Sequence, residues 1–212
     1  MRQLTGGMST PTVFSSSAAE LIVERSRFVA KTFHLPDPEA LETCLTAMKD
    51  DWPQAHHYTW AYRIGPSQQR AFDDGEPHQT AGLPMLNLLV RQDWTETLVI
   101  VARYFGGIKL GRGGLVRAYQ AACQKGLDAT VKARLATIRH ITLQIPYRHY
   151  DRAVQWLAPV AISWHEAFGD LVTIELSIEY DKWLRLEPRL NASGEWTLIR
   201  QHDEPGRIPL DS

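Results

Sequence analysis

The sequence predicts an α+β fold in two domains, and three observations carry this prediction. The second half of the chain alternates β-rich runs and helical segments in the order βαββαβ, which is the ferredoxin-like unit. The first half mixes β-rich runs with helices of amphipathic spacing. Almost no linker-like sequence separates the halves, so we place one domain at residues 15–134 and the other at residues 135–203.

The first domain begins with "ELIVERSRFVAKTFHL", in which two β-rich runs flank a charged turn and predict a hairpin. Asp37 then precedes Pro38, a pairing typical of a helix start, and apolar residues follow at helical spacing as far as Trp52. The segment "HHYTWAYRIG" alternates as a strand does. The sequence therefore predicts a hairpin, a helix and a third strand in this order.

The segment "FDDGEPHQTAGLPM" is predicted to be a loop, and Thr80 to open a helix that ends near Leu89 or Val90. The β-branched, apolar run from Thr95 to Tyr104 predicts a buried strand. A glycine-rich loop follows it, and then a helix predicted from about Gly113 to Ala133.

The second domain has a regular rhythm of elements. Its predicted strands are Thr137–Ile145, Val160–Phe168, Leu171–Tyr180 and Glu195–Gln201, and its predicted helices are Tyr147–Leu157 and Lys182–Leu190. A tight turn at Gly169-Asp170 joins the second and third strands. We expect the first fourteen residues and the tail "DEPGRIPLDS" to be frayed.

Composition limits the classes of function. The 212-residue chain is 44% hydrophobic and 22% charged, with a formal net charge of -1, so no overall charge favours nucleic acid or a membrane. Its longest apolar run, near Leu98–Ala102, is too short to span a bilayer, and we expect no membrane partner. Cys44 and Cys123 are isolated, without a Cys-x-x-Cys pair, which favours a reducing cytoplasm over a disulfide framework or a zinc knuckle.

The segment "ARYFGGIKLGRGGLVRAYQ" places five of the 14 glycines within nine positions. A buried strand, a glycine-rich loop and a helix start together form a common anion site, because unpaired backbone N–H groups and the positive helix end point at one place. Gly113 and Gly114 lie at that helix start, and four cations surround it: Arg103, Lys109, Arg112 and Arg117. No carboxylate occurs between Glu96 and Asp128. The pattern predicts an anion site.

A second interpretation of the same loop stays open: the glycines allow a tight crossover and the cations are solvated. The loop is not a P-loop, because Arg112-Gly113 stand where Lys and Ser/Thr are required after Gly106 and Gly111. It is not a dinucleotide fingerprint either, because Val116 takes the third-glycine position. Tyr104 and Phe105 flank the loop and are candidates to stack on a base, although Tyr104 equally suits the last core position of its strand.

The segment "FDDGEPHQTAG" gathers Asp73, Asp74 and Glu76 within four residues, with Thr80 close behind. Such carboxylates can bind magnesium or carry out acid–base chemistry. The alternative is a turn, because Asp-Gly is a frequent turn dipeptide in which Asp caps its own backbone. No cofactor and no metal is predicted, since this is not an EF-hand loop and no nucleophile elbow or zinc-binding His-Glu-x-x-His is present.

Two segments, "DDGEPHQTAGLPML" and "VARYFGGIKLGRGGLVRAY", resemble in this order the signature pair of the IMPACT/YigZ family. The resemblance extends from about Ser15 to Gln201 and includes "ERSRF" and "AHHYTWAYRIG". It implies an N-terminal domain like the second domain of a small-subunit ribosomal protein. It also implies a ferredoxin-like C-terminal domain resembling the last domain of elongation factor G. The sequence departs from the family at Gln79, where a glycine or small residue is usual.

The resemblance also implies a link to translation. Eukaryotic relatives are translational regulators that bind a ribosome-associated activator and so restrain a stress kinase. The two-domain layout resembles the bacterial branch, where neither that activator nor that kinase is expected. What the resemblance implies here is a surface suited to RNA, the ribosome or a translation-related protein partner.

Three hypotheses follow from the sequence. The first is a non-enzymatic RNA- or ribosome-binding protein that regulates translation and contacts phosphates through the cations of the glycine loop. The second is an enzyme acting on a phosphorylated small molecule or nucleotide, which needs the glycine loop and the carboxylates of the Asp-Asp-Gly-Glu segment to share one cleft. The third is that both motifs serve folding and that binding uses the ferredoxin-like domain.

Overall fold

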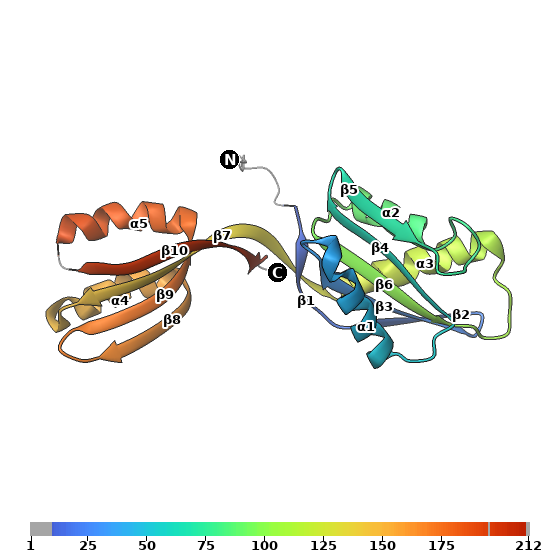
Figure 1. Cartoon of the computed structure of the whole chain (residues 1–212), viewed down its shortest axis with the longest axis horizontal. Coiled ribbons are helices and arrows are strands. Elements are labelled where there is room, and N and C mark those ends of the chain that lie inside the picture. The colour runs from blue at the N-terminus through green and yellow to red at the C-terminus, as the bar shows by residue number, and fades with distance from the viewer. Residues whose placement is uncertain (1–9, 195, 211–212) are drawn as a thin grey trace. The chain divides into compact units, whose positions relative to one another are not determined.

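The computed structural model describes residues 10–194 and 196–210, which form a mixed α+β fold with two antiparallel five-stranded sheets (Figure 1). These residues divide into two compact units. One contains the described residues up to Arg134 together with the end of the chain from Ile208, and the other runs from Leu135 to Arg207.

The sheet of the first unit has the strand order β2-β3-β6-β4-β5. These strands are β2 (Ala19–Val23), β3 (Ser26–His34), β4 (His57–Gly65), β5 (Gln68–Phe72) and β6 (Thr97–Tyr104). The predicted hairpin is present, and its last pair joins Val23 to Ser26. Strand β6 lies between β3 and β4, and every residue of it before Tyr104 is buried, which explains its continuous apolar run.

Helices cover both faces of this sheet, because alternate residues of β6 enter two different apolar clusters. Val99 and Val101 pack with residues of α2 (Gly82–Arg91) and α3 (Gly111–Asp128). Leu98, Ile100 and Ala102 pack with residues of α1 (Leu41–Asp51). A 3-10 turn, Pro38–Ala40, precedes α1, and the carboxylate of Asp37 caps it by accepting a hydrogen bond from the Glu39 N–H.

The other five-stranded sheet has the order β1-β7-β9-β8, where β1 is Thr12–Ser16, and β10 also pairs with β7. The strands of this sheet in the second unit therefore follow the order β10-β7-β9-β8. Its elements follow one another as β7 (Thr130–Ile145), α4 (Tyr150–Leu157), β8 (Ala161–Phe168), β9 (Val172–Glu179), α5 (Tyr180–Ser193) and β10 (Thr197–Pro209), with 3-10 turns at Tyr147–His149 and Ala158–Val160. Leu143 of β7 packs with Leu157 of α4 and Trp183 of α5. The helices therefore cover one face of the sheet, and the alternate residues of β7, such as His140 and Thr142, lie on the other face.

The structure corrects four predictions about element ends. Helix α3 ends at Asp128 rather than near Ala133, and the residues from Thr130 belong to β7. Residues 12–14, predicted to be frayed, belong to strand β1 (Thr12–Ser16), which pairs with the start of β7. The tail is also ordered in a strand, because β10 continues to Pro209. Strand β5 occupies residues that were not predicted to be extended. Residues 1–9 and 211–212 of the predicted frayed ends lie outside the described residues.

None of the described helices has both the length and the apolar character that a membrane span requires. Cys44 is partly buried and Cys123 is buried, and both are free thiols. Burial raises the pKa of the Cys123 thiol, which therefore stays protonated and behaves as a small apolar side chain in the core.

The Arg139–Asp203 pair joins β7 to β10 and predicts an acid-sensitive contribution to stability. Arg139 donates two hydrogen bonds of 2.7 and 2.8 Å to the carboxylate, and they hold the pKa of Asp203 below its usual range. A carboxyl group with a lowered folded-state pKa stabilises the fold above its unfolded pKa of about 3.9, and this contribution disappears as pH falls through the folded value. Asp203→Asn should therefore lower the thermal midpoint at pH 7 and lower it by less near pH 3, where the contribution has begun to disappear. Equal losses at both pH values, measured by circular dichroism, would contradict this.

Candidate functional site

The loop that joins β5 to α2 carries the Asp-Asp-Gly-Glu motif, and its first carboxylate holds the start of α2. Asp73 Oδ1 accepts hydrogen bonds from the backbone N–H groups of Ala81 (3.1 Å) and Gly82 (2.8 Å). Asp73 Oδ2 accepts a third, from the Gln79 N–H at 2.8 Å. A carboxylate at a helix N-terminus satisfies donors that lack intrahelical partners and opposes the positive helix end. Asp73 is thus fully engaged with the backbone.

Asp74 and Thr80 are also held within this loop. Asp74 Oδ2 accepts a 2.6 Å hydrogen bond from the Tyr58 N–H on β4, and its backbone oxygen lies 2.6 Å from His57 Nδ1. The Thr80 hydroxyl donates to the Pro77 carbonyl at 2.6 Å. The turn interpretation of the sequence therefore accounts for both residues.

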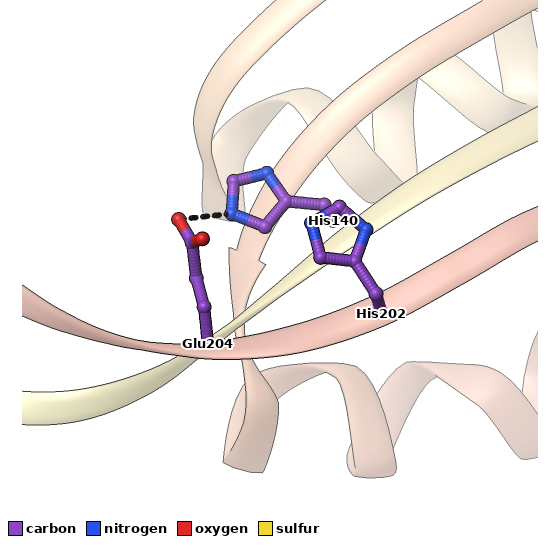
Figure 2. Close-up of side chains that lie close together, drawn as sticks. All are labelled: His140, His202 and Glu204. Carbon is purple, nitrogen blue, oxygen red and sulfur yellow. Dashed lines mark hydrogen bonds and ion pairs between the residues drawn. The ribbon is translucent and has the colours of Figure 1, made fainter.

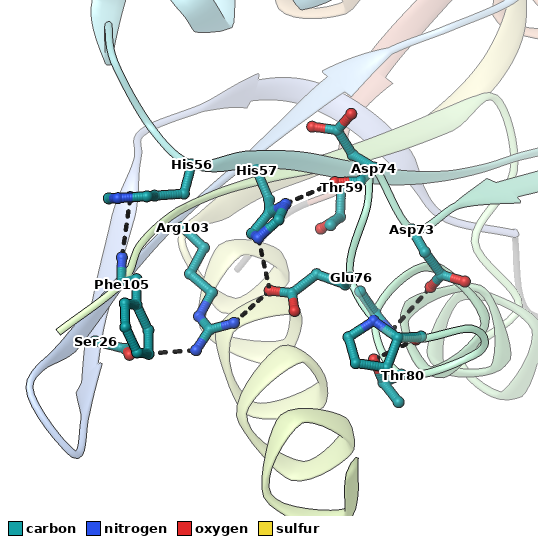
Figure 3. A network of polar contacts seen from close by, with 12 residues as sticks. Ser26, His56, His57, Thr59, Asp73, Asp74, Glu76, Thr80, Arg103 and Phe105 are labelled. Carbon is teal, nitrogen blue, oxygen red and sulfur yellow. Dashed lines mark hydrogen bonds and ion pairs between the residues drawn. The ribbon is translucent and has the colours of Figure 1, made fainter. Parts of the chain in front are cut away.

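The third carboxylate, Glu76, is buried and belongs to a polar network inside the first unit (Figure 3). Glu76 Oε1 accepts hydrogen bonds from Arg103 Nη1 at 2.5 Å and from the Tyr119 hydroxyl at 2.7 Å. Arg103 Nη2 also donates to Ser26 Oγ at 3.4 Å. His57 Nε2 lies 3.9 Å from Glu76 Oε1. One carboxylate thus connects the loop after β5 to β6 and α3, and through Arg103 to β3.

The side chains of this network lie in a buried, largely apolar environment. The Arg103 guanidinium lies 5.3 Å from the ring centroid of Phe28 and 5.7 Å from that of Phe105, and its Nε is buried without a hydrogen-bond partner among the described residues. Burial, followed by the nearby Glu76 charge, raises the pKa of Tyr119, so its hydroxyl stays protonated and donates. Arg103 was predicted to contact a phosphate. Its side chain instead points inward and is paired with Glu76.

The glycine loop makes a close crossover at Gly106. A Cβ added there would lie 2.1 Å from the carbonyl carbon and oxygen of Arg25, in the turn between β2 and β3. The Gly106 N–H donates to Ser26 Oγ at 3.3 Å, and the Phe105 N–H donates to His56 Nδ1 at 3.1 Å. The crossover interpretation is therefore correct for Gly106, where no other residue would fit without movement of the backbone.

The exposed cations of the loop surround the start of α3. Lys109, Arg112 and Arg117 are all exposed. Arg117 Nη1 lies 3.6 Å from the place where a Cβ on Gly113 would be, so its guanidinium folds back toward the helix start. Arg112 Nη2 donates to the His78 carbonyl at 2.8 Å, which joins the glycine loop to the Asp-Asp-Gly-Glu loop. The first turn of α3 contains no acidic residue.

A groove of about 550 Å³ adjoins this helix start. Lys109, Gly114 and Arg117 line it together with apolar side chains that include Leu21 and Ile108. The carboxylate among its lining residues is Glu24. Two cations, a helix N-terminus and an apolar wall suit a ligand that combines negative charge with an apolar or aromatic part.

The two aromatic candidates differ in access. The Tyr104 hydroxyl donates to the Pro53 carbonyl at 3.0 Å, and the Arg27 guanidinium lies 5.4 Å from the centroid of its ring. Phe105, by contrast, is 42% exposed. Phe105 is therefore the better stacking surface beside the loop.

Sequence reasoning missed the partners that complete the network, among them Ser26 and Tyr119. His56 and His57 are neighbours in the chain, and the structure gives them different partners, the Phe105 N–H and the Asp74 backbone oxygen. A polar hydroxyl on the buried face of α3 was an available signal for Tyr119.

The Glu76–Arg103 pair predicts strong coupling between its partners. Glu76→Leu or Arg103→Leu alone should lower the free energy of unfolding by about 3–5 kcal/mol, because each leaves an uncompensated buried charge. The double variant should lose less than the sum of the two losses, by about 0.5–3 kcal/mol. Denaturant unfolding of the four proteins measures this. Asp51→Ala, which removes the partly exposed Lys31–Asp51 pair, is the control and should cost at most about 1 kcal/mol. Additive losses would refute the coupling.

Two glycines of the loop should respond in opposite ways to alanine. Gly106→Ala should destabilise the protein by about 1–3 kcal/mol, because the new methyl group meets backbone that must move. Gly113→Ala should be neutral or stabilising by up to about 1 kcal/mol, since its nearest neighbour is an arginine side chain 3.6 Å away and alanine favours helix. Denaturant unfolding distinguishes them, and equal effects would show that the close approach at Gly106 is not a constraint.

Comparison with known proteins places both motifs in one family. Residues 24–127, which contain both loops, match the Impact N-terminal domain. The IMPACT family member YvyE of Bacillus subtilis is 34% identical over 192 residues, covering 87% of this chain and 83% of YvyE. Protein IMPACT homolog of Saccharomyces cerevisiae is 34% identical over 103 residues, covering 45% of this chain and 39% of that protein. A crystal structure of a hypothetical protein is similar with a TM-score of 0.59 at 26% identity, covering 90% of this chain and 96% of the other. The chain therefore belongs to the IMPACT family.

Proposed function

We propose that this protein is a non-enzymatic binding protein that regulates translation by contacting RNA or the ribosome through the glycine loop and the start of α3. One observation carries the proposal: Lys109, Arg112 and Arg117 are exposed around a helix N-terminus whose first turn contains no acid. Because the net charge of the chain is -1, attraction for a polyanion has to be local, and this site supplies it.

The chemistry of the site suits a phosphate followed by a base. Backbone N–H groups in the first turn of α3 and its positive end favour a phosphate oxygen. The Arg117 guanidinium lies at the same turn and adds a planar donor for phosphate. The exposed ring of Phe105 beside the loop supplies a stacking surface, and base stacking on an aromatic side chain contributes about 1–3 kcal/mol.

We further propose that the two units are the domain types that the family resemblance implies. The order β10-β7-β9-β8 corresponds to strands four, one, three and two of a βαββαβ unit, which supports a ferredoxin-like second domain. We assign the first unit to the ribosomal-protein-like domain type. The resemblance also implies translational regulation in eukaryotic relatives, and the yeast relative matches this chain over 103 residues. A fold alone does not specify a function, so the cations at α3 remain the decisive feature.

The enzyme hypothesis loses its main support. The glycine loop does lie beside the Asp-Asp-Gly-Glu loop, because Arg112 donates to the His78 carbonyl. The carboxylates are nevertheless engaged: Asp73 and Asp74 accept backbone hydrogen bonds, and Glu76 is buried against Arg103. A carboxylate that holds backbone donors or a buried guanidinium is a poor base and a poor magnesium ligand.

The proposal predicts salt-dependent RNA binding that the loop cations control. The triple variant Lys109→Ala, Arg112→Ala, Arg117→Ala should lose ribosome co-sedimentation and binding to short single-stranded RNA. With about three phosphates neutralised, the wild-type slope of log affinity against log salt should be roughly -2. The matched control is Arg70→Ala, Arg91→Ala, Arg185→Ala, which removes the same charge from exposed positions elsewhere and should bind as the wild type does.

Three other outcomes contradict the proposal. Equal losses of RNA binding in the two triple variants would show that binding depends on net charge and not on the position of the cations. No binding by the wild type at low salt would exclude RNA and the ribosome as partners. Binding that survives the loop variant but is lost when the second unit is altered would move the interaction to that unit.

A further inference from the structure

The uncovered sheet face of the second unit carries three metal-ligand side chains that the proposed translation role does not use. His140 lies on β7, and His202 and Glu204 lie two residues apart on the neighbouring strand β10 (Figure 2). Residues two apart on a strand share a face, so the pairing of β10 with β7 brings all three together. Their ligand atoms lie within 4.8 Å of one another.

We propose that His140, His202 and Glu204 form a binding site for Zn²⁺. Two imidazoles and one carboxylate are a ligand set that suits zinc, whereas magnesium and calcium prefer oxygen ligands alone. Zinc bonds of about 2.0–2.2 Å in a tetrahedral arrangement place ligand atoms about 3.3 Å apart. The 2.8 Å separation of His140 Nε2 and Glu204 Oε1 and the 4.8 Å upper limit bracket this value.

The surroundings of His140 orient it for this role. Its Nδ1 lies 2.8 Å from the Oγ of Ser177, a residue of β9 that is only 8% exposed. An ion bound at Nε2 would replace the hydrogen bond between this nitrogen and Glu204 and would leave Nδ1–H to donate to the Ser177 hydroxyl, as in metal-binding histidines whose second nitrogen is held by an outer partner. The rings of His140 and His202 stack with centroids 4.6 Å apart and planes at 12°.

The strand register keeps the ligands in place while their side chains can still adjust. Arg139 precedes His140 on β7, and Asp203 lies between His202 and Glu204 on β10. Arg139 and Asp203 form an ion pair with two hydrogen bonds between these strands. The side chains of His140 and Glu204 are 31% and 56% exposed, so they have room to turn toward an ion. The backbone positions are therefore set and the ligand atoms are adaptable.

Three protein ligands leave one tetrahedral position for water or another ligand. Both histidines line a hollow of about 370 Å³ on this sheet face, whose other lining residues include His165 and Arg200. His165 is a useful control, because it shares the hollow but does not belong to the ligand cluster.

The test measures metal binding by the full chain. Equilibrium dialysis gives the number and affinity of bound Zn²⁺ ions, and visible absorption gives the coordination of bound Co²⁺. We expect one Zn²⁺ per chain and an intense Co²⁺ spectrum of the four-coordinate type. His202→Ala and Glu204→Gln should each weaken Zn²⁺ binding at least 100-fold, and Ser177→Ala about tenfold, while His165→Ala should bind as the wild type does. Circular dichroism shows that each variant is folded.

Three results would overturn the assignment. The first is no Zn²⁺ binding by the folded wild type at 100-fold molar excess. The second is Zn²⁺ binding that His202→Ala and Glu204→Gln leave unchanged, which would place the ion elsewhere. The third is a Co²⁺ spectrum of the weak, six-coordinate type, which would exclude a site built from these three ligands and one further position.

Discussion

A buried ion pair between Glu76 and Arg103 organises the first unit. Removing one partner of such a pair costs more free energy than forming the pair contributes, because the remaining charge is buried without a partner or water. The pair therefore acts as a constraint on the segments that supply its partners: the loop after β5, strand β6, helix α3 and the start of β3. All of these have to be in place together. A loop without regular structure is thereby fixed to the core as firmly as a strand.

This constraint also explains why the surface beside it is shaped as it is. Ser26 accepts from Arg103 and from the Gly106 N–H, so the buried network and the glycine loop share one hydroxyl. The glycine loop packs against the turn between β2 and β3. Only glycine at position 106 lets the two backbones lie so close together. The cations that follow are then left at the helix start, exposed and away from Glu76. Ser26 and Gly106 thus fix the position of the loop, whereas the cations that follow in the sequence supply its surface charge.

Much of the fold could be predicted because local patterns were strong, as in the β2–β3 hairpin and the apolar run of β6. Strands β1, β5 and the end of β10 were missed, since their sequences are polar or contain proline and glycine and their pairing partners lie elsewhere in the chain. The site motifs were found by residue type, but Arg103 was misassigned. Alternation along β6 was the missed signal: Val99, Val101 and Arg103 share one face, and that face is covered by α3. At Gln79, where the family usually has a small residue or glycine, the backbone has a φ of +61°, the left-handed region that glycine favours. This conformation explains why glycine suits the position, and Gln79 adopts it without the freedom that glycine has.

The chain passes between the two units twice. Strand β7 begins in the first unit and continues in the second, and after β10 the chain returns to the first unit, where the Leu210 N–H donates to the Lys132 carbonyl at 2.9 Å. In connectivity, the second unit is an insertion rather than an appendage. During synthesis the first unit consequently cannot complete this last pairing until Leu210 has emerged from the ribosome. After a single proteolytic cut between Arg134 and Leu135, the two fragments would share no peptide bond, and the returning end of the second fragment would still pair with the first through hydrogen bonds.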